Sequence, residues 1–334
     1  MKKYFFLLGV CIVLGSCSTG DATAVSKVLG GGSSQAVTFL NCRAVSEDEI
    51  EFEFSKAVTV QSLSLDPELP IASVEDGSIV KVKLGENVAS GLLVNVDMLA
   101  EDADKNSINV LTSFRSRNSQ MPKLVINEVC TEATSPKTEF IEFKMKTAGN
   151  LGGLRIFIMG NTNATKQTIY EFSSVNVKKD DYVLLHLRTR LESYKDEYNG
   201  NKEESSGDNS SLSAWDFYVP GNDKLIHDTA SAVYVLDQDD NVLDAVMISK
   251  DPSTWWDKDY FAEAADFLFQ QGAWKSPEGE ICSPTDAVRS AGTTNTRTIC
   301  RDETVEDSNT AADWYIVYTS NATPGKPNNS RRWN

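Results

Sequence analysis

Three glutamates lie near the starts of two neighbouring apolar segments, where their spacing could support acid–base chemistry. Glu128 belongs to the segment 124–129, and Glu139 and Glu142 belong to the segment 139–143. Two carboxylates act as acid and base when burial or mutual repulsion moves their pKa values apart. The alternative role is structural, in which these carboxylates accept hydrogen bonds from the backbone of nearby loops.

A second acidic group, formed by Asp237, Asp239 and Asp240, lies between two apolar runs and is followed by Asn241. Its carboxylates could ligate Ca²⁺, a hard cation that takes about 6–8 oxygen ligands. The spacing matches an EF-hand loop only in part, because Gly and Glu are missing from the sixth and twelfth positions. Asp and Asn also suit tight turns. The favoured interpretation is therefore a hairpin turn, with calcium binding as the alternative.

A group of aromatic residues is the candidate binding surface. It comprises Trp255, Trp256, Tyr260 and Trp274. Aromatic side chains are enriched at interface hot spots and stack on sugars or peptides. Neighbouring residues of a strand or helix seldom bury both side chains on one face, so one residue of the Trp255–Trp256 pair is expected to be exposed. The favoured interpretation is that these residues bury a small core of their own or cover a sandwich, with the binding surface as the alternative.

Other catalytic signatures are missing from the sequence. His186 and His227 are its two histidines, and neither belongs to a recognisable triad. The sequence contains no G-x-S-x-G, H-E-x-x-H, P-loop or Rossmann motif. A zinc site is disfavoured because C-x-x-C pairs are also missing. We therefore expect no intrinsic enzymatic activity and no cofactor, apart from the calcium alternative.

The first residues of the chain have the pattern of an export signal. Lys2 and Lys3 precede an apolar run, 4–14, that is too short to span a bilayer. Residues 14–17 read L-G-S-C, which resembles a bacterial lipobox. The resemblance implies removal of residues 1–16 and attachment of acyl chains such as palmitate to Cys17. The expected location is the bacterial cell envelope, anchored by lipid to the outer rather than the inner membrane.

The charge and the cysteines limit the partners and the cross-links. The formal net charge is −16, which disfavours binding of nucleic acid. Four cysteines remain after the signal and the lipid site, and an even number outside the cytoplasm permits disulfides. Cys282 and Cys300 flank a polar loop and are the predicted disulfide. Cys42 and Cys130 are interpreted as thiols buried in strands.

Residues 17–36 form a Gly/Ser-rich segment and are interpreted as a flexible tether after the lipid site. Residues 37–117 contain several strand-like runs in which apolar and polar residues alternate, as in Ile50, Phe52 and Phe54. Residues 53–58 read E-F-S-K-A-V and resemble the F-S-K-P-V strand of bacterial Ig-like domains of the surface-layer type. The turn 102–106 is similar to that family's D-x-x-G-N turn. The resemblance implies a β-sandwich that acts as a spacer or binding module.

Residues 122–328 carry motifs of a second family. Residues 126–129 read I-N-E-V, residues 139–143 read E-F-I-E-F, and residues 323–328 read T-P-G-K-P-N. This order resembles the lamin-tail domain family, although Leu154 stands where Trp is common. The resemblance implies an Ig-like β-sandwich in which the three glutamates belong to the fold signature, which favours their structural role.

Two stretches of this second domain are longer than the family needs and are interpreted as insertions, near 188–230 and 251–312. Within the first insertion, residues 203–211 have the composition of a solvated loop. Within the second, the apolar spacing of residues 259–271 predicts a short helix.

The sequence therefore predicts an all-β protein with two Ig-like β-sandwich domains in tandem. The expected function is that of a lipid-anchored envelope protein, acting without catalysis in binding, adhesion or as a scaffold. Its expected partners are the membrane, through the N-terminal lipid, and a protein or a glycan. The alternative is an extracytoplasmic hydrolase or nuclease-associated protein, for which calcium is the candidate cofactor, because lamin-tail domains often accompany such enzymes.

Overall fold

The computed structural model describes residues 25–27, 36–160, 167–205, 207, 209–277, 279 and 281–333. The predicted signal peptide, the lipidation site Cys17 and most of the predicted tether lie outside the described residues. The predicted all-β class is confirmed, because strands dominate the described residues and α1 (Asp259–Gln270) is the one α-helix among them. No helix in this part of the chain is long and apolar enough to cross a bilayer.

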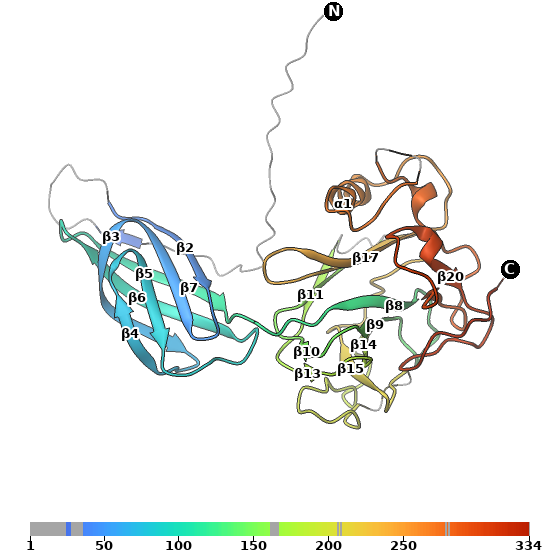
Figure 1. Cartoon of the computed structure of the whole chain (residues 1–334), viewed down its shortest axis with the longest axis horizontal. Helices are drawn as coiled ribbons and strands as arrows, with labels where there is room; N and C mark the ends of the chain where they lie inside the picture. The colour runs from blue at the N-terminus through green and yellow to red at the C-terminus, as the bar shows by residue number, and fades with distance from the viewer. Residues whose placement is uncertain are drawn as a thin grey trace, which may run out of the picture. The chain divides into compact units, whose positions relative to one another are not determined.

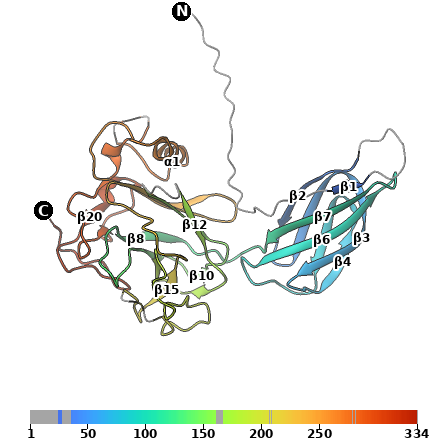
Figure 2. The same ribbon diagram turned by 180° about the vertical axis from the view of Figure 1, so that it is seen from behind.

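The described residues up to Asn87, together with Leu93–Arg115, form the first of two compact units. Its strands are β1 (Val25–Lys27), β2 (Phe39–Ala44), β3 (Glu49–Asp66), β4 (Ile71–Glu75), β5 (Gly77–Leu84), β6 (Leu93–Asp102) and β7 (Ser107–Arg115). They make one seven-stranded sheet in the order β1-β7-β6-β3-β5-β4, with β2 paired to β3 (Figures 1 and 2). All of these pairings are antiparallel.

The core of the first unit follows the predicted alternation. Ile50 and Phe52 of β3 are buried, and they lie directly opposite Val82 and Val80 of β5. The intervening Glu51 and Glu53 are more exposed. Residues directly opposite each other on antiparallel strands share one face, so these four apolar side chains lie side by side on the same buried face of the sheet. The period of two in the sequence is thus the cause of this sheet's single buried face.

The second unit comprises Val88–Leu92 and the chain from Ser116 onward. Its strands before the helix are β8 (Leu124–Cys130), β9 (Phe140–Met145), β10 (Gly149–Asn150), β11 (Arg155–Gly160), β12 (Thr168–Glu171), β13 (Asn176–Val177), β14 (Tyr182–His186), β15 (Ala214–Tyr218), β16 (Ala230–Leu236) and β17 (Val242–Ser249). After α1 come the 3₁₀ helices η1 (Pro284–Asp286) and η2 (Ala311–Asp313) and the strands β18 (Val288–Arg289), β19 (Ile299–Arg301) and β20 (Trp314–Ile316).

These strands build two main sheets in the second unit. One is five-stranded, in the order β12-β11-β16-β17-β18, and the other is six-stranded, in the order β15-β14-β9-β8-β19-β20. A small sheet pairs β10 with β13. Residues of both main sheets and of α1 share one buried cluster, which includes Ile126, Val233 and Leu268. This is the main core of the second unit, and a smaller buried cluster of Cys130, Phe140, Tyr182, Leu184 and Ala214 lies apart from it.

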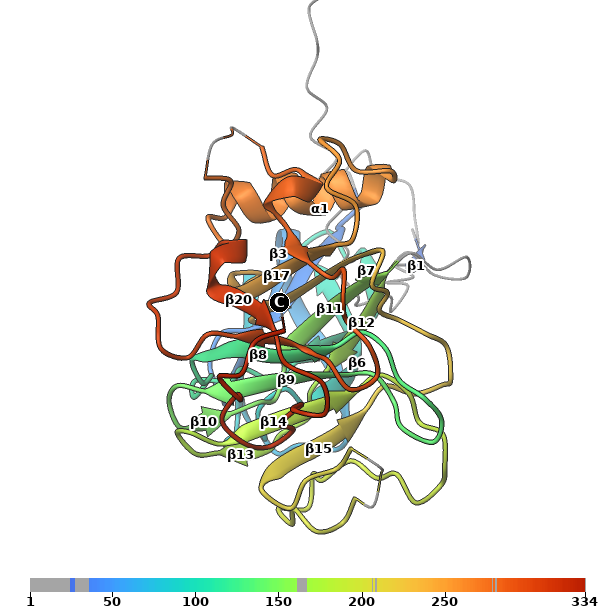
Figure 3. The same cartoon turned by 90° about the vertical axis from the view of Figure 1, so that its right-hand side faces the viewer.

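Helix α1 lies on the side of the five-stranded sheet that faces away from β9 and β14 (Figure 3). Its buried residues, Phe261, Ala264, Ala265 and Leu268, have the i, i+3, i+4, i+7 spacing of one helix face. Phe267 contacts Tyr234 of β16, with 5.8 Å between the ring centroids. With α1 on one face of the sheet and the six-stranded sheet on the other, β16 is buried along its whole length. The short helix predicted within 259–271 is confirmed.

The first predicted insertion adds an edge strand to the six-stranded sheet. β15 pairs in parallel with β14, with Val183 opposite Trp215. Among the described residues of the segment 203–211, predicted as a solvated loop, Ser205 and Gly207 are buried. Ser205 is buried, its backbone N–H donates to Glu197, and its hydroxyl bonds to that of Tyr218. The solvated-loop prediction is therefore wrong for Ser205, whose polar groups bond to buried partners, whereas Glu203 of the same segment is exposed.

Candidate functional site

A pocket of about 460 Å³ opens in the second unit where the β16–β17 hairpin meets the second insertion. β17 ends at Ser249, and the chain then passes through a polar loop before α1 begins at Asp259. We call this the Trp255 pocket; its lining includes Thr229, Lys250, Asp251, Trp255, Trp256 and Asp257. A volume of this size lies within the usual range of small-molecule sites, about 300–1,000 Å³.

The two neighbouring tryptophans of this pocket point into different surroundings. Trp255 is 72% exposed, whereas Trp256 is partly buried. The indole N–H of Trp256 donates to the carbonyl of Cys282 at 3.1 Å, and its ring lies 5.8 Å from that of Phe261. The prediction that one residue of the pair is exposed is confirmed. The exposed ring is Trp255, because Trp256 has the polar partner and the packing that hold it against the core.

The other two aromatic candidates pack against the fold. Tyr260 is half-buried, with its ring centroid 4.6 Å from that of Phe261. Trp274 is 1% exposed, and its indole N–H donates to the carbonyl of Asp286 at 3.1 Å. The assignment of Trp274 to a binding surface is wrong: the chain turns back after α1 and places this ring in the core that α1 covers.

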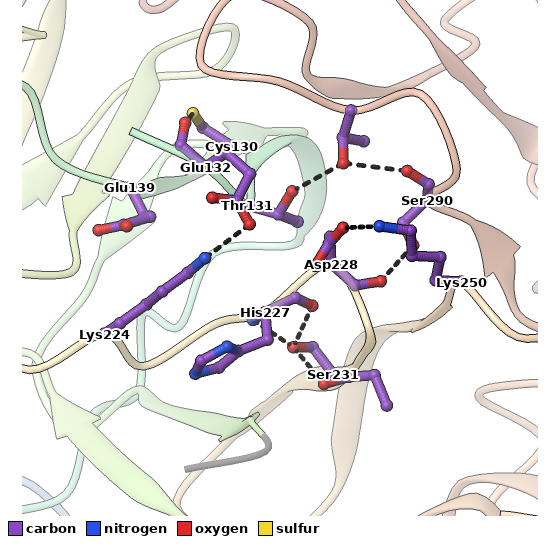
Figure 4. Close-up of polar contacts among 12 residues, drawn as sticks. Cys130, Thr131, Glu132, Glu139, Lys224, His227, Asp228, Ser231, Lys250 and Ser290 are labelled. Atoms are coloured by element: carbon purple, nitrogen blue, oxygen red, sulfur yellow. Dashed lines mark hydrogen bonds and ion pairs between the residues drawn. The ribbon is translucent and has the colours of Figure 1, made fainter. Parts of the chain in front are cut away.

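The strand end that forms one wall of the pocket is held by a polar network (Figure 4). Lys250 Nζ lies 2.7 Å from a carboxylate oxygen of Asp228, and this contact raises the pKa of the lysine. The hydroxyl of Ser290 donates to the backbone carbonyl of Asp228. The hydroxyl of Ser231 accepts from the backbone N–H of His227 and donates to its carbonyl, each at 2.9 Å. These contacts fix the backbone beside Thr229, so the wall is preorganised.

His227 contributes no charge to this network. Burial is the first cause of a lowered pKa, and the nearby Lys224 lowers it further. The Nε2 atom of His227 is buried and has no hydrogen-bond partner among the described residues. Lys224 pairs with Glu132 instead, at 2.6 Å (Figure 4). We assign this histidine no catalytic role.

Two of the three glutamates singled out in the sequence hold a loop. Glu128 accepts from the backbone N–H of Thr323 at 3.1 Å, and Glu142 accepts from that of Gly325 at 2.6 Å. Burial raises the pKa of both carboxyls, and the charge of Glu128 raises that of Glu142 further. The predicted bonding to loop backbone is therefore confirmed for these two residues.

Glu139 has a different partner from the other two glutamates. Both of its carboxylate oxygens bind the guanidinium of Arg188, each at 2.7 Å. Glu139 is buried, so this bidentate pair satisfies a charge that water does not reach. Its predicted bonding to loop backbone is wrong, because the first insertion brings Arg188 onto it.

The aspartates proposed as calcium ligands build a hairpin turn between β16 and β17. Asp237 accepts from the backbone N–H groups of Asp239 and Asn241, at 2.8 and 2.9 Å. Asp239 pairs with Arg117, and Asp240 pairs with Arg155. The turn interpretation is confirmed. The residues do not fit a calcium site, since two of the three carboxylates face guanidinium groups, and no metal-ligand cluster occurs among the described residues.

The predicted disulfide between Cys282 and Cys300 is wrong: both are free thiols, as are Cys42 and Cys130. Cys282 lies in the insertion beside Trp274, and its thiol contacts that residue's carbonyl at 3.7 Å. Cys300 lies in β19, where its sulfur contacts Thr298 at 3.6 Å. The two cysteines thus pack in different parts of the second unit. Burial raises the pKa of Cys282 to about 12.

Sequence reasoning missed a buried polar cluster around β14 and β15. His186 Nε2 lies 2.7 Å from a carboxylate oxygen of Asp216, and both residues are 1% exposed. Glu197 accepts from the backbone N–H of Asp216 at 2.7 Å, and burial raises its pKa to about 7. The one available signal was His186 at the end of an apolar strand. Because these groups are shielded from solvent, we assign them a structural role.

The polar lining of the Trp255 pocket was also missed. Lys250, Asp251 and Asp257 occur in a run after β17 that has the composition of an ordinary surface loop. A second hollow, of about 330 Å³, lies in the first unit; its lining residues carry carboxylates and hydroxyls but include no aromatic ring. The Trp255 pocket is therefore the better candidate, because it combines an exposed ring with polar groups.

These features define an all-β protein with an aromatic pocket on its second unit. The family model TP_1001_2nd, described as "protein second domain", matches residues 122–316. Since this match covers more than half of the chain, the chain belongs to that family. It is also similar to a protein of Treponema pallidum (strain Nichols) named "Uncharacterized protein", with 24% identity over 238 residues. The similarity covers 69% of this chain and 59% of that relative, so the chain spans little more than half of the relative's length.

Proposed function

We propose that this chain is an exported, lipid-anchored protein that binds a partner at the Trp255 pocket without transforming it. The observation that carries the proposal is the 72% exposure of Trp255 beside a polar pocket of about 460 Å³. Tryptophan is among the residues most enriched at binding hot spots. The anchored Trp256 and the fixed strand end beside Thr229 support the loop, so little conformational entropy is lost on binding.

The N-terminal sequence supports export and anchoring. Lys2 and Lys3, the apolar run and the L-G-S-C sequence together form a lipoprotein signal in which Cys17 carries the lipid. One acyl chain anchors a protein only marginally, and two or three hold it durably. The tether that follows would keep the folded units at a distance from the membrane.

The motif positions support a lamin-tail-like Ig fold for the second unit. Glu128, from the I-N-E-V sequence, and Thr323, from the T-P-G-K-P-N sequence, are hydrogen-bonded to each other. This hydrogen bond joins the first and the last motif of the domain, so the two motifs stabilise the same part of the fold. We propose that the first unit is a surface-layer-type Ig-like spacer and that the second carries the binding site.

The binding proposal is tested with envelopes from cells that lack the protein. Purified full-length chain carrying Cys17→Ala, which removes the lipid, is incubated with these envelopes, and the retained protein is measured. We expect Trp255→Ala to lower retention about tenfold, as for the loss of a hot-spot side chain. Leu212→Ala is the control, because Leu212 is 74% exposed and does not line the pocket. Equal retention of all three proteins would contradict the proposal.

The anchoring proposal has its own test. Cells are labelled with a palmitate analogue, and intact cells are treated with protease beside a periplasmic marker. We expect label on the wild type and none on Cys17→Ala, because the thiol is the acylated group. Loss of the protein with the marker spared would place it on the cell surface, whereas protection until lysis would place it in the periplasm. An unlabelled wild type would contradict lipid anchoring.

A further inference from the structure

We infer that the Trp255 pocket binds a neutral saccharide. This inference rests on the proposed function and specifies the chemistry of the partner. The pocket combines one exposed aromatic ring, two aspartates and a threonine hydroxyl, the groups that the apolar face and the hydroxyl rim of a sugar would meet.

The ring of Trp255 is a supported platform. The Ser253 hydroxyl donates to the carbonyl of Trp255 at 2.7 Å, and the Ser253 backbone N–H donates to Asp251 at 3.1 Å. These bonds close a small turn that holds the loop behind the ring. Covering an exposed aromatic face with an apolar surface removes both from water and is therefore favourable. The C–H face of a pyranose is flat and rigid, so stacking on Trp255 costs the ligand little conformational entropy.

The polar groups beside the ring are free to bond a ligand. The carboxylate of Asp257 and the hydroxyl of Thr229 make no hydrogen bond with other described residues. Asp251 uses only one carboxylate oxygen, which accepts from Ser253. An ionised carboxylate offers about four acceptor positions, so these aspartates can accept from adjacent sugar hydroxyls. A purely apolar partner would leave those groups desolvated and unpaired, which weakens binding.

The charge of the pocket selects against anions. Lys250, the one cation in the lining, is already paired with Asp228 at 2.7 Å. Asp251 and Asp257 therefore leave the lining negative, in a chain whose formal net charge is −16. Phosphate, sulfate and the carboxylates of acidic sugars would be repelled. A neutral saccharide meets no such repulsion.

The aromatic geometry selects against a quaternary ammonium ligand. Such cations are bound in cages of several aromatic faces. Here Trp256 packs against Phe261 and donates its indole N–H to Cys282, so Trp255 alone offers a widely exposed ring. One ring with adjacent hydrogen-bond acceptors is a stacking platform rather than a cage.

The test uses the full-length chain purified in mild detergent. An array of neutral oligosaccharides with hexose, N-acetylhexosamine and deoxyhexose residues is screened, and hits are titrated by calorimetry. Sialyllactose and choline are titrated in parallel as anionic and cationic probes. For a neutral hit we expect Trp255→Ala to weaken binding about tenfold, from the loss of stacking, and Asp257→Asn to weaken it several-fold. Leu212→Ala should leave the affinity unchanged.

Three results would overturn the inference: no binding to any neutral glycan, tighter binding of choline or sialyllactose, or affinity unchanged by Trp255→Ala. If envelope retention still depends on Trp255 while the neutral glycans fail, the binding function stands and its partner is not a neutral saccharide. If retention does not depend on Trp255 while a neutral glycan binds at that residue, the saccharide chemistry stands without the envelope partner. Circular dichroism spectra of each variant exclude unfolding as the cause of lost binding.

Discussion

Glu128 on β8 and Glu142 on β9 lie directly opposite each other in the sheet, and both carboxylates accept hydrogen bonds from the loop 323–325. Like charges in directly opposed positions are destabilising. Burial raises the pKa of both groups, and the charge of Glu128 adds to the rise at Glu142. The pair is therefore more stable with at least one proton bound.

Glu142→Gln should make the second unit less sensitive to rising pH. A folded-state pKa above the unfolded value contributes stability below the unfolded pKa, and that contribution is lost as the pH rises through the folded pKa. The wild type should thus lose the Glu142 contribution above about pH 4.5, and the variant, whose amide cannot ionise at this position, should lose less stability over the same range. Asn127 Oδ1 has no partner among the described residues, so this amide can rotate to accept from the new side chain.

The measurement for this prediction is the free energy of unfolding in urea at several pH values. All six tryptophans lie at or after Trp215, so their fluorescence reports the second unit. Glu53→Gln, at an exposed position of the first unit, is the matched control and should retain the slope of the wild type. Parallel slopes for wild type and Glu142→Gln would contradict the prediction.

Arg301→Met should be strongly destabilising. Arg301 binds both carboxylate oxygens of the buried Asp244, at 2.9 and 2.7 Å, and its Nε donates to the carbonyl of Ile126. Burial raises the pKa of Asp244 to about 6 although Arg301 lowers it. Removing the arginine leaves a buried carboxylate unpaired, at a cost of about 3–5 kcal/mol. Urea unfolding followed by tryptophan fluorescence measures this loss.

The double variant Arg301→Met with Asp244→Leu separates charge from packing. Since both charges are then absent, we expect it to recover much of the lost stability. Arg332→Met is the surface comparison: its pair with Asp302 has a 53% exposed arginine side chain, so at most about 1 kcal/mol should be lost. A double variant as unstable as Arg301→Met would show that the arginine stem, rather than the ion pair, carries the effect.

Local periodicity predicted the elements that depend on nearby residues. The alternation at Ile50 and Phe52 predicted β3, and the spacing of Phe261 and Leu268 predicted α1. Neighbouring side chains point in different directions, which predicted that one tryptophan of the Trp255–Trp256 pair is exposed. Trp255 is the exposed residue. In each case the cause lies within one turn of helix or a few residues of strand.

The predictions that were wrong, and the contacts that were missed, depend on how distant parts of the chain fold together. Cys282 and Cys300 are close in sequence, but a disulfide needs the two Cα atoms within about 7 Å, which spacing alone does not fix. The burial of Trp274 follows from where the chain turns after α1. Glu197 and Asp216 meet because the first insertion folds against β15. Sequence composition described this insertion as polar but did not give the buried partners of its polar groups.

Glu197→Gln should also make the stability of the second unit less sensitive to rising pH. Burial raises the pKa of Glu197 to about 7, so the wild type should lose stability as the pH rises from about 4.5 through 7. Its two oxygens accept from the backbone N–H groups of Ser205 and Asp216. Glutamine retains one acceptor oxygen, so the variant should be about 1 kcal/mol less stable at pH 5.

Unfolding of Glu197→Gln is compared with that of Glu192→Gln, which changes an exposed glutamate in the same insertion. We expect the exposed variant to follow the wild type from pH 5 to pH 8. An unchanged slope in Glu197→Gln would mean that this carboxyl ionises in the folded state without a cost.

Trp255→Ala and Trp274→Ala should have opposite effects on binding and stability. Trp274 is 1% exposed, and its truncation should cost about 3–5 kcal/mol, as for other buried aromatic residues. Trp255 is 72% exposed, so its truncation should change stability by no more than about 0.5 kcal/mol. Urea unfolding measures both values. A large loss of stability in Trp255→Ala would mean that its ring supports the fold, and the binding assays would then need another variant.

Cys282 and Cys300 should be reduced thiols that react slowly with alkylating reagents in the folded protein. Both thiols are buried, and burial raises both pKa values, to about 12 for Cys282, so little reactive thiolate is present near neutral pH. We expect iodoacetamide to modify both residues in urea without reductant and neither residue in native buffer. Peptide mass spectrometry of the two samples makes the comparison. A peptide that carries Cys282 linked to Cys300 before reduction would contradict the free thiols, and the melting temperature should be the same with and without reductant.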